Sequence, residues 1–210
     1  IDLIRKRKPP TTNPDASPDV YFMILNAMQY SIKSKTSAML LPLLGVLILL
    51  SGCKAQPRHT AIRLPDQESE SVILVGTASL DSLYQPPFVN WYDPNIREYT
   101  PNETVIESLE PLLEDVEITL FMGTWCEDSQ REVPRFVKIL QEVGYPPERV
   151  RLITMNRDKK TPQNYEKGRS IINVPTFIFY RDQEEVGRIV EYPIESLESD
   201  MLKIMSGAPY

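Results

Sequence analysis

Cysteine and histidine are scarce in this sequence of 210 residues, which contains two cysteines and one histidine. A structural zinc site needs about four ligands at close spacing, and His59 has no Cys or His neighbour at such spacing. Basic residues are fewer than acidic ones, so the formal net charge is −6. Nucleic-acid binding requires the opposite charge balance. We therefore predict no metal site, no bound cofactor and no nucleic-acid partner.

Long apolar runs are also few, and the one over residues 38–50 follows a leader segment, residues 1–27. Residues 1–27 contain a basic run, residues 5–8, and a stretch rich in Pro, Thr, Asn and Ser. We interpret this segment as either a mis-called upstream start or a disordered leader. The start of translation would then be Met28, with Met23 and Met39 as alternatives.

Residues 28–52 have the organisation of a secretory signal peptide. Lys33 and Lys35 precede an apolar run over residues 38–50, which at 13 residues is shorter than the roughly 20 that span a bilayer. The run ends in Leu-Ser-Gly-Cys53, which resembles the bacterial lipoprotein lipobox. The resemblance implies that Cys53 is lipidated and that the protein is anchored to the membrane in the bacterial cell envelope, facing outside the cytoplasm, in the periplasm or at the cell surface. An uncleaved N-terminal anchor is the alternative.

Two further segments separate this anchor from the centre of the chain. Residues 53–71 are polar after the lipidated Cys53 and predict a tether. Residues 72–102 begin with an apolar strand-like run, residues 72–75, and continue with many aromatic residues and prolines. We interpret them as an N-terminal extension packed on the core. An aromatic lip on a substrate groove is the alternative.

The chain is organised around Cys126. A short apolar run over residues 118–122 predicts a buried strand, and apolar residues at helical spacing predict a helix over residues 128–143. Cys126 then lies where a strand ends and a helix begins, so unpaired N–H groups and the helix dipole stabilise a thiolate there. Trp125 would form an apolar wall beside it. The competing interpretation is a small buried hydrophobic cysteine.

Further elements follow from periodicity and breakers. Residues 100–115 predict a helix with Asn102 as its N-cap. Residues 156–162 predict a solvated polar loop that contains Arg157. The remaining expected elements are a strand at 150–155, a short helix at 163–170, strands at 176–180 and 185–191, and a final helix at 194–205.

The motif Trp125-Cys126-x-x-Ser129, together with Val174-Pro175-Thr176 before a strand, resembles the thioredoxin family over about residues 105–206. The resemblance implies an α/β thioredoxin-like fold, with a central mixed β-sheet flanked by helices on both faces. It assigns this fold to residues 103–210, preceded by the N-terminal extension. It also implies that Pro175 is cis and packs beside the reactive cysteine.

The site departs from the family pattern, because Ser129 replaces the second cysteine and Glu127 and Asp128 follow the first. Two carboxylates disfavour a thiolate, although acidic residues are common in a first helical turn. Arg131 and Arg135 could compensate if their side chains fold back. Ser129 cannot resolve a mixed disulfide, but it could donate a hydrogen bond to the thiolate.

Two functional hypotheses remain. The first is a membrane-tethered thiol–disulfide oxidoreductase or isomerase that acts through a single cysteine on protein or small-molecule thiols and disulfides. Its candidate catalytic residues are Trp125, Cys126, Ser129 and Pro175. The second is a redox-inactive thioredoxin-like binding or chaperone module. A peroxidase is less favoured, because no resolving cysteine is available.

Overall fold

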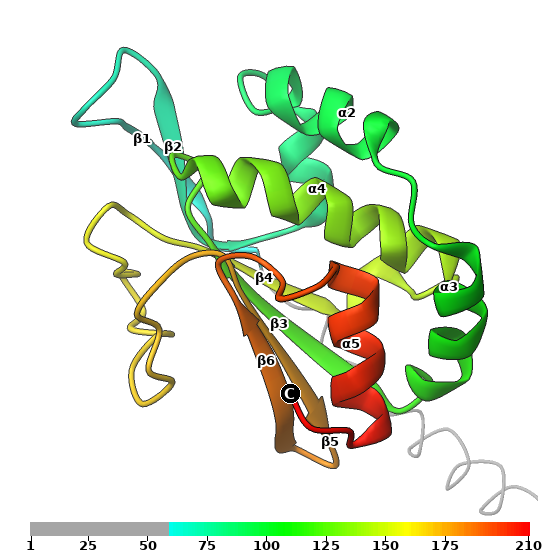
Figure 1. Ribbon diagram of the computed structural model, residues 1–210. Coiled ribbons are helices and arrows are strands. Elements are labelled where there is room, and N and C mark those ends of the chain that lie inside the picture. The colour runs from blue at the N-terminus through cyan, green and yellow to red at the C-terminus, as the bar shows by residue number, and fades with distance from the viewer. Residues whose placement is uncertain (1–58) are drawn as a thin grey trace, which may run out of the picture. The chain divides into compact units, whose positions relative to one another are not determined.

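The computed structural model describes residues 59–210 (Figure 1). The expected leader, signal peptide and lipidated Cys53 lie outside the described residues. A six-stranded sheet forms the centre of the described part, in the order β1-β2-β4-β3-β5-β6. Its strands are β1 (Ile62–Pro65), β2 (Val72–Ala78), β3 (Val116–Met122), β4 (Val150–Thr154), β5 (Thr176–Arg181) and β6 (Glu184–Val190).

The sheet is mixed, as the resemblance implies. Strands β3 and β4 run parallel, whereas the other neighbouring pairs in this sheet are antiparallel. A parallel pair needs a crossover connection, and the helix that follows β3 provides it. This helix is α4 (Glu127–Glu142). The apolar run before Cys126 and the helix after it therefore both form where the sequence places them.

Three more α-helices accompany α4 in the described residues. They are α2 (Val89–Glu98), α3 (Glu103–Leu109) and α5 (Leu197–Ser206). Asn102 caps α3 as predicted, since its side chain accepts a hydrogen bond from the Val105 N–H. The α-helix is shorter than residues 100–115, because a 3-10 turn containing Pro111 follows it directly. Within residues 59–210 no helix combines the length and the apolar character that a membrane crossing requires.

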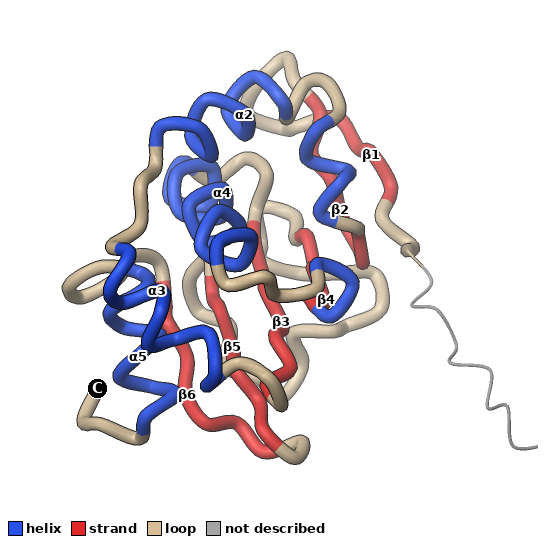
Figure 2. The backbone as a smooth tube through the Cα atoms, turned by 90° about the vertical axis from the view of Figure 1, so that its right-hand side faces the viewer, coloured by secondary structure: helices blue, strands red, loops and turns tan. Residues whose placement is uncertain are grey.

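All four of these α-helices pack on one face of the sheet (Figure 2). Alternate residues of β3 reach this face, where Ile118, Leu120 and Met122 are buried. The apolar stripe predicted for α4 meets them, through Val133, Phe136, Val137 and Leu140. A large, continuous apolar core therefore fixes α4, and with it the position of Cys126.

The opposite face has a smaller buried cluster, formed by Phe121, Ile153, Met155, Val174 and Ile178. Residues 156–175 cover this cluster as a succession of turns and bends. The expectation of helices on both faces of the sheet is therefore wrong for the described residues.

The prediction of a short helix at residues 163–170, within this covering segment, is also wrong. Asn164, Gly168 and Ser170 have left-handed backbones, with φ of 55°, 77° and 53°. Left-handed residues interrupt a right-handed helix. The side chain of Glu166 instead accepts hydrogen bonds from the Thr161 N–H and hydroxyl, which closes a compact turn.

The N-terminal part of the described residues differs from the expected tether. Ile62–Pro65 form β1, an edge strand that pairs antiparallel with β2. The last part of the predicted tether, expected to reach residue 71, therefore belongs to a β-hairpin. The aromatic stretch that follows packs inward, since Leu83, Phe88 and Tyr92 are at most 1% exposed and belong to the core on the helix-covered face.

Candidate functional site

Cys126 lies at the junction between β3 and α4. It is the N-cap residue of α4 and has an extended backbone, with φ −89° and ψ 125°. Its N–H donates to the Gly123 carbonyl at 3.0 Å, and its carbonyl accepts the Gln130 N–H at 2.9 Å. The first N–H groups of a helix have no partner within the helix, and the dipole is positive there. The predicted strand-to-helix position of the cysteine is therefore confirmed.

The thiol contacts the segment that precedes β5. Cys126 is partly exposed, and its Sγ donates a hydrogen bond to the Val174 carbonyl at 3.2 Å. The Val174–Pro175 peptide bond is cis, as the resemblance implies, and Pro175 is buried. The fold therefore brings together two segments that lie 48 residues apart in the chain.

The Trp125 indole is held in place on the same side of the sheet as Cys126. Its indole N–H donates to the Met155 carbonyl at 3.0 Å. Trp125 and Cys126 both pack against the small cluster that contains Phe121. A Cβ atom at Gly123 would lie 2.6 Å from the indole ring, so the ring occupies space that a glycine leaves open.

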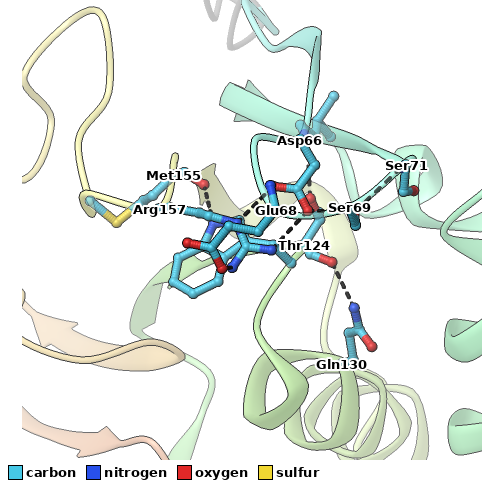
Figure 3. A network of polar contacts seen from close by, with 10 residues as sticks. Asp66, Glu68, Ser69, Ser71, Thr124, Gln130, Met155 and Arg157 are labelled. Carbon is cyan, nitrogen blue, oxygen red and sulfur yellow. Dashed lines mark hydrogen bonds and ion pairs between the residues drawn. The ribbon is translucent and has the colours of Figure 1, made fainter.

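Arg157 joins Trp125 to the loop of the β1–β2 hairpin. Figure 3 shows its contacts with Asp66 and Glu68 of that loop. Its guanidinium lies 5.1 Å from the centroid of the Trp125 ring, which is a cation–π distance. It also donates to both carboxylate oxygens of Asp66, at 2.7 and 2.8 Å, and pairs with Glu68 at 2.6 Å. The hydrogen bond from Arg157 holds the pKa of Asp66 well below its usual range.

The prediction that Arg157 is a solvated loop residue is therefore wrong. Its side chain connects positions 91 residues apart. The available signal was weak: an acidic turn at residues 66–70 complements the basic loop at residues 157–160. Nothing local distinguishes Arg157 from the lysines that follow it.

Thr124 stabilises the turn between β3 and α4 through two hydrogen bonds. Its hydroxyl accepts the Leu74 N–H of β2 at 3.0 Å, and its carbonyl accepts a hydrogen bond from the Gln130 side chain at 2.8 Å. Ser129 is fully buried, and its Oγ accepts the Gly123 N–H at 3.3 Å. Within the described residues no hydrogen bond joins Ser129 to Cys126, so the hydroxyl supports the turn.

The charges on α4 pair among themselves. Arg131 contacts Asp128 and Glu132, each at 2.6 Å, and Arg135 contacts Glu132 at 3.3 Å. The hydrogen bonds to Glu132 and Asp128 raise the pKa of Arg131. Arg131 thus offsets the charge of Asp128. Neither Arg131 nor Arg135 folds back onto the Cys126 thiol, although the sequence allows it.

Large exposed apolar side chains flank the site. Ile172 is 73% exposed and lies in the segment that leads to Pro175. Tyr192 and Ile194 are 62% and 73% exposed and follow Glu191, whose N–H donates to the Pro175 carbonyl at 2.7 Å. We call these three residues the apolar rim. The described residues contain no group of three or more Cys, His, Asp or Glu arranged to hold a metal ion.

A family model described as thioredoxin matches residues 91–202. The match contains α4, Trp125, Cys126, Ser129 and Pro175, and it covers the sheet from β3 to β6. No curated protein matches the sequence.

The solved structures that are similar to this chain are distant from it in sequence. A crystal structure of a protein of unknown function from Pseudomonas aeruginosa is 13% identical with a TM-score of 0.50, over 63% of this chain and 94% of that one. An HIV epitope-scaffold protein is 14% identical with a TM-score of 0.46, over 63% and 100%. A yeast mitochondrial 1-Cys peroxiredoxin is 26% identical with a TM-score of 0.28, over 43% and 79%. At these identities the likeness to the Pseudomonas protein concerns the fold alone.

Proposed function

Since the chain belongs to the thioredoxin family, we propose that it exchanges thiols and disulfides through the single thiol of Cys126. The observation that carries the proposal is the placement of this thiol. Cys126 is partly exposed, caps the N-terminus of α4 and lies 3.2 Å from the Val174 carbonyl. A thiolate at that point can attack an incoming disulfide, whereas a buried structural cysteine could not.

The reaction begins when the Cys126 thiolate attacks one sulfur of a substrate disulfide. The substrate S–S bond breaks, a mixed disulfide with Cys126 forms, and the second substrate sulfur leaves as a thiolate. Ser129 cannot release this intermediate, because its hydroxyl is buried on Gly123 and is a poor nucleophile.

Release therefore requires a thiol from outside the domain. A second thiolate of the same substrate attacks the mixed disulfide, forms a new substrate disulfide and returns Cys126 as a thiolate. The net reaction is isomerisation, with no change in oxidation state. A small-molecule thiolate that attacks the Cys126 sulfur instead releases the substrate as a dithiol and leaves a mixed disulfide between itself and Cys126. A second small-molecule thiolate then returns Cys126 as a thiolate and forms the small-molecule disulfide, so two thiols supply the two electrons for net reduction.

The apolar rim suits protein substrates with exposed apolar segments. Ile172, Tyr192 and Ile194 present exposed aliphatic and aromatic surface in the segment before Pro175 and in the segment after Glu191. Burial of such surface gives affinity without sequence specificity. We therefore expect misfolded proteins with incorrect disulfides as the main substrate class.

The test uses the full chain with Cys53→Ser, so that Cys126 is the one thiol left. This protein should restore activity to a scrambled disulfide substrate and should accumulate mixed disulfides that an alkylating quench traps. Cys126→Ala should lose both properties. Ser129→Cys should shorten the life of the mixed disulfide and raise net reductase activity, and Ser129→Ala is its size-matched control. If Cys126→Ala refolds the substrate as fast as its parent, the thiol is not catalytic.

A redox-inactive binding module is the second candidate. The apolar rim favours it, because binding through Ile172, Tyr192 and Ile194 needs no thiol. In that case Cys126→Ala would suppress aggregation of an unfolded protein as well as its parent does. Ile172→Ser combined with Ile194→Ser would abolish the suppression.

The proposed location is the bacterial cell envelope, facing outside the cytoplasm in the periplasm or at the cell surface, with the domain anchored by lipid on Cys53. The signal sequence and lipobox pattern support it. Labelled palmitate should appear on the protein in a bacterial host, and Cys53→Ser should remove the label. An unlabelled, freely released wild-type protein would contradict the anchor.

A further inference from the structure

The part of the second sheet face that residues 156–175 leave uncovered contains a hollow of about 390 Å³. Its floor comes from β3, β4 and β5, where Thr119 is the register partner of Arg151 and Glu117 that of Tyr180. The other lining residues are Ile118, Arg149, Arg169 and Gln183. We call this site the arginine hollow.

The three arginines of this hollow have no carboxylate partner. Within residues 59–210, Arg149, Arg151 and Arg169 form no ion pair, whereas five other arginines pair with Asp or Glu: Arg97, Arg131, Arg135, Arg157 and Arg188. Arg149 donates to the carbonyls of Glu114 and Val116, and Arg169 donates to the carbonyl of Tyr165. A guanidinium has several N–H donors, so each side chain retains donors for a ligand.

Aromatic rings hold two of these guanidinium groups. Arg151 lies 5.0 Å from the centroid of the Tyr165 ring, and Arg149 lies 5.1 Å from that of Tyr145. The groups come from separate segments, since Arg149 and Arg151 flank the start of β4 and Arg169 belongs to the covering loop. Groups positioned before binding lose less conformational freedom when a ligand arrives.

The charge of the hollow opposes that of the domain. Residues 54–210 carry 17 basic and 26 acidic side chains, a net charge of −9. The lining has three arginines and one acidic residue, Glu117, a net charge of +2. A phosphate monoester carries roughly −1.5 to −2 charges at neutral pH and matches the planar donors of arginine. We propose that the arginine hollow binds the phosphate group of a small soluble phosphate ester.

The shape of the site favours a small molecule over a lipid headgroup. Ligand sites are concave and about 300–1,000 Å³ in volume, and this hollow of about 390 Å³ falls in that range. Glu117 in the lining disfavours a flat, densely charged membrane surface. The proposal does not rest on the thiol chemistry, because neither Cys126 nor Trp125 lines the hollow.

The experiment measures binding of inorganic phosphate and glycerol phosphate to the full chain at constant ionic strength, by calorimetry. Saturable binding of both, with succinate at least several-fold weaker, is expected. Arg151→Gln should weaken phosphate binding by about tenfold, the size of one charge-assisted contact. Glu117→Gln should strengthen it several-fold, because it removes the one like charge. Arg97→Gln, on α2 and paired with Asp93, is the matched control and should change nothing.

Arg169→Gln provides an independent variant if Arg151→Gln does not fold, and circular dichroism identifies that case. The proposal is overturned if phosphate fails to bind at about 10 mM, or if the Arg151 and Arg97 variants respond equally. It is also overturned if Glu117→Gln weakens binding. Arg151-dependent sedimentation with phosphatidylglycerol vesicles, without binding of glycerol phosphate, would reject the small-molecule ligand.

Discussion

The two faces of the sheet are formed by the same strands but differ in what covers them. On β3, Leu120 belongs to the core beneath four α-helices, while its neighbour Phe121 belongs to the small cluster beneath residues 156–175. The helix-covered face is large and apolar. The other face contacts Trp125 and Cys126, and further along it becomes polar and forms the arginine hollow.

This difference separates stability from chemistry. Buried apolar surface under regular helices supplies the main free energy of folding. The second face contributes less to the free energy of folding, because turns cover it incompletely and less apolar surface is buried there. It keeps a partly exposed thiol, an indole in a cation–π contact with Arg157, and arginines without a carboxylate partner among the described residues within reach of ligands.

The largest expected effect compares one phenylalanine from each face. Phe136 and Phe121 are both fully buried, and the Phe136 ring lies 4.5 Å from the Phe177 ring. Phe136→Ala should lower the free energy of unfolding by about 3–5 kcal/mol. Phe121→Ala should cost about 3 kcal/mol or less, because the irregular cover can collapse into the space. Urea denaturation measures both, and equal costs would refute the contrast between the faces.

A smaller effect is expected at the helix caps on the stable face. The Asn102 side chain accepts the Val105 N–H at 3.3 Å. Asn102→Ala should therefore lower the free energy of unfolding by about 1 kcal/mol. The control is Ser108→Ala, since the Ser108 hydroxyl donates only to the Thr104 carbonyl inside the helix and its loss should be nearly neutral. Thermal unfolding distinguishes the two, and a larger loss for Ser108→Ala would contradict the capping role.

On the second face a change should act locally. Asp66→Asn removes the bidentate partner of Arg157 and the acceptor of the Ser69 hydroxyl at 2.6 Å. Amide hydrogen exchange should accelerate several-fold in the β1–β2 hairpin, with little change in the unfolding midpoint. Glu68→Gln is the control, because Glu68 is 67% exposed and such ion pairs contribute little. Equal acceleration in both variants would show that the Asp66 pair does not hold the hairpin.

The same pair predicts the smallest effect, a dependence on acid. The Arg157 hydrogen bond lowers the pKa of Asp66 in the folded state. A carboxyl group with a lowered pKa stabilises the fold above its unfolded value of about 3.9, and this contribution is lost as the pH falls through the folded value. Hairpin protection should therefore be constant above about pH 4 and decline below it. In Asp66→Asn this decline should be absent, and hydrogen exchange over a pH series measures the difference.

The sequence predicts the regions where apolar residues are periodic. The strand before Cys126 and the stripe on α4 are found this way, and they place the thiol correctly. β1 is missed because it has only four residues, all of them exposed, and ends at a proline inside a polar segment. α2 is missed as a helix, because Pro94 lies within it and a proline normally interrupts a helix.

The site is predicted only as far as its local motifs reach. Trp125, Cys126 and Pro175 are recognised from residues next to them in the chain. Arg157 is not, because its partner Asp66 lies 91 residues away and a lone arginine in a polar loop resembles any solvated one. The arginine hollow is equally invisible, since only the strand register brings its charges together.

The contact between Arg157 and Trp125 also gives the molecule an optical probe of its own. The chain has two tryptophans, and the other, Trp91, lies on α2 and packs against the helix-covered core. Trp91→Phe would leave Trp125 as the single indole emitter, with a guanidinium 5.1 Å from its ring. Release of the hairpin removes that charge from the ring, so the emission of Trp125 should shift. Its fluorescence would then follow the joining of hairpin and thiol site in real time, without an attached label.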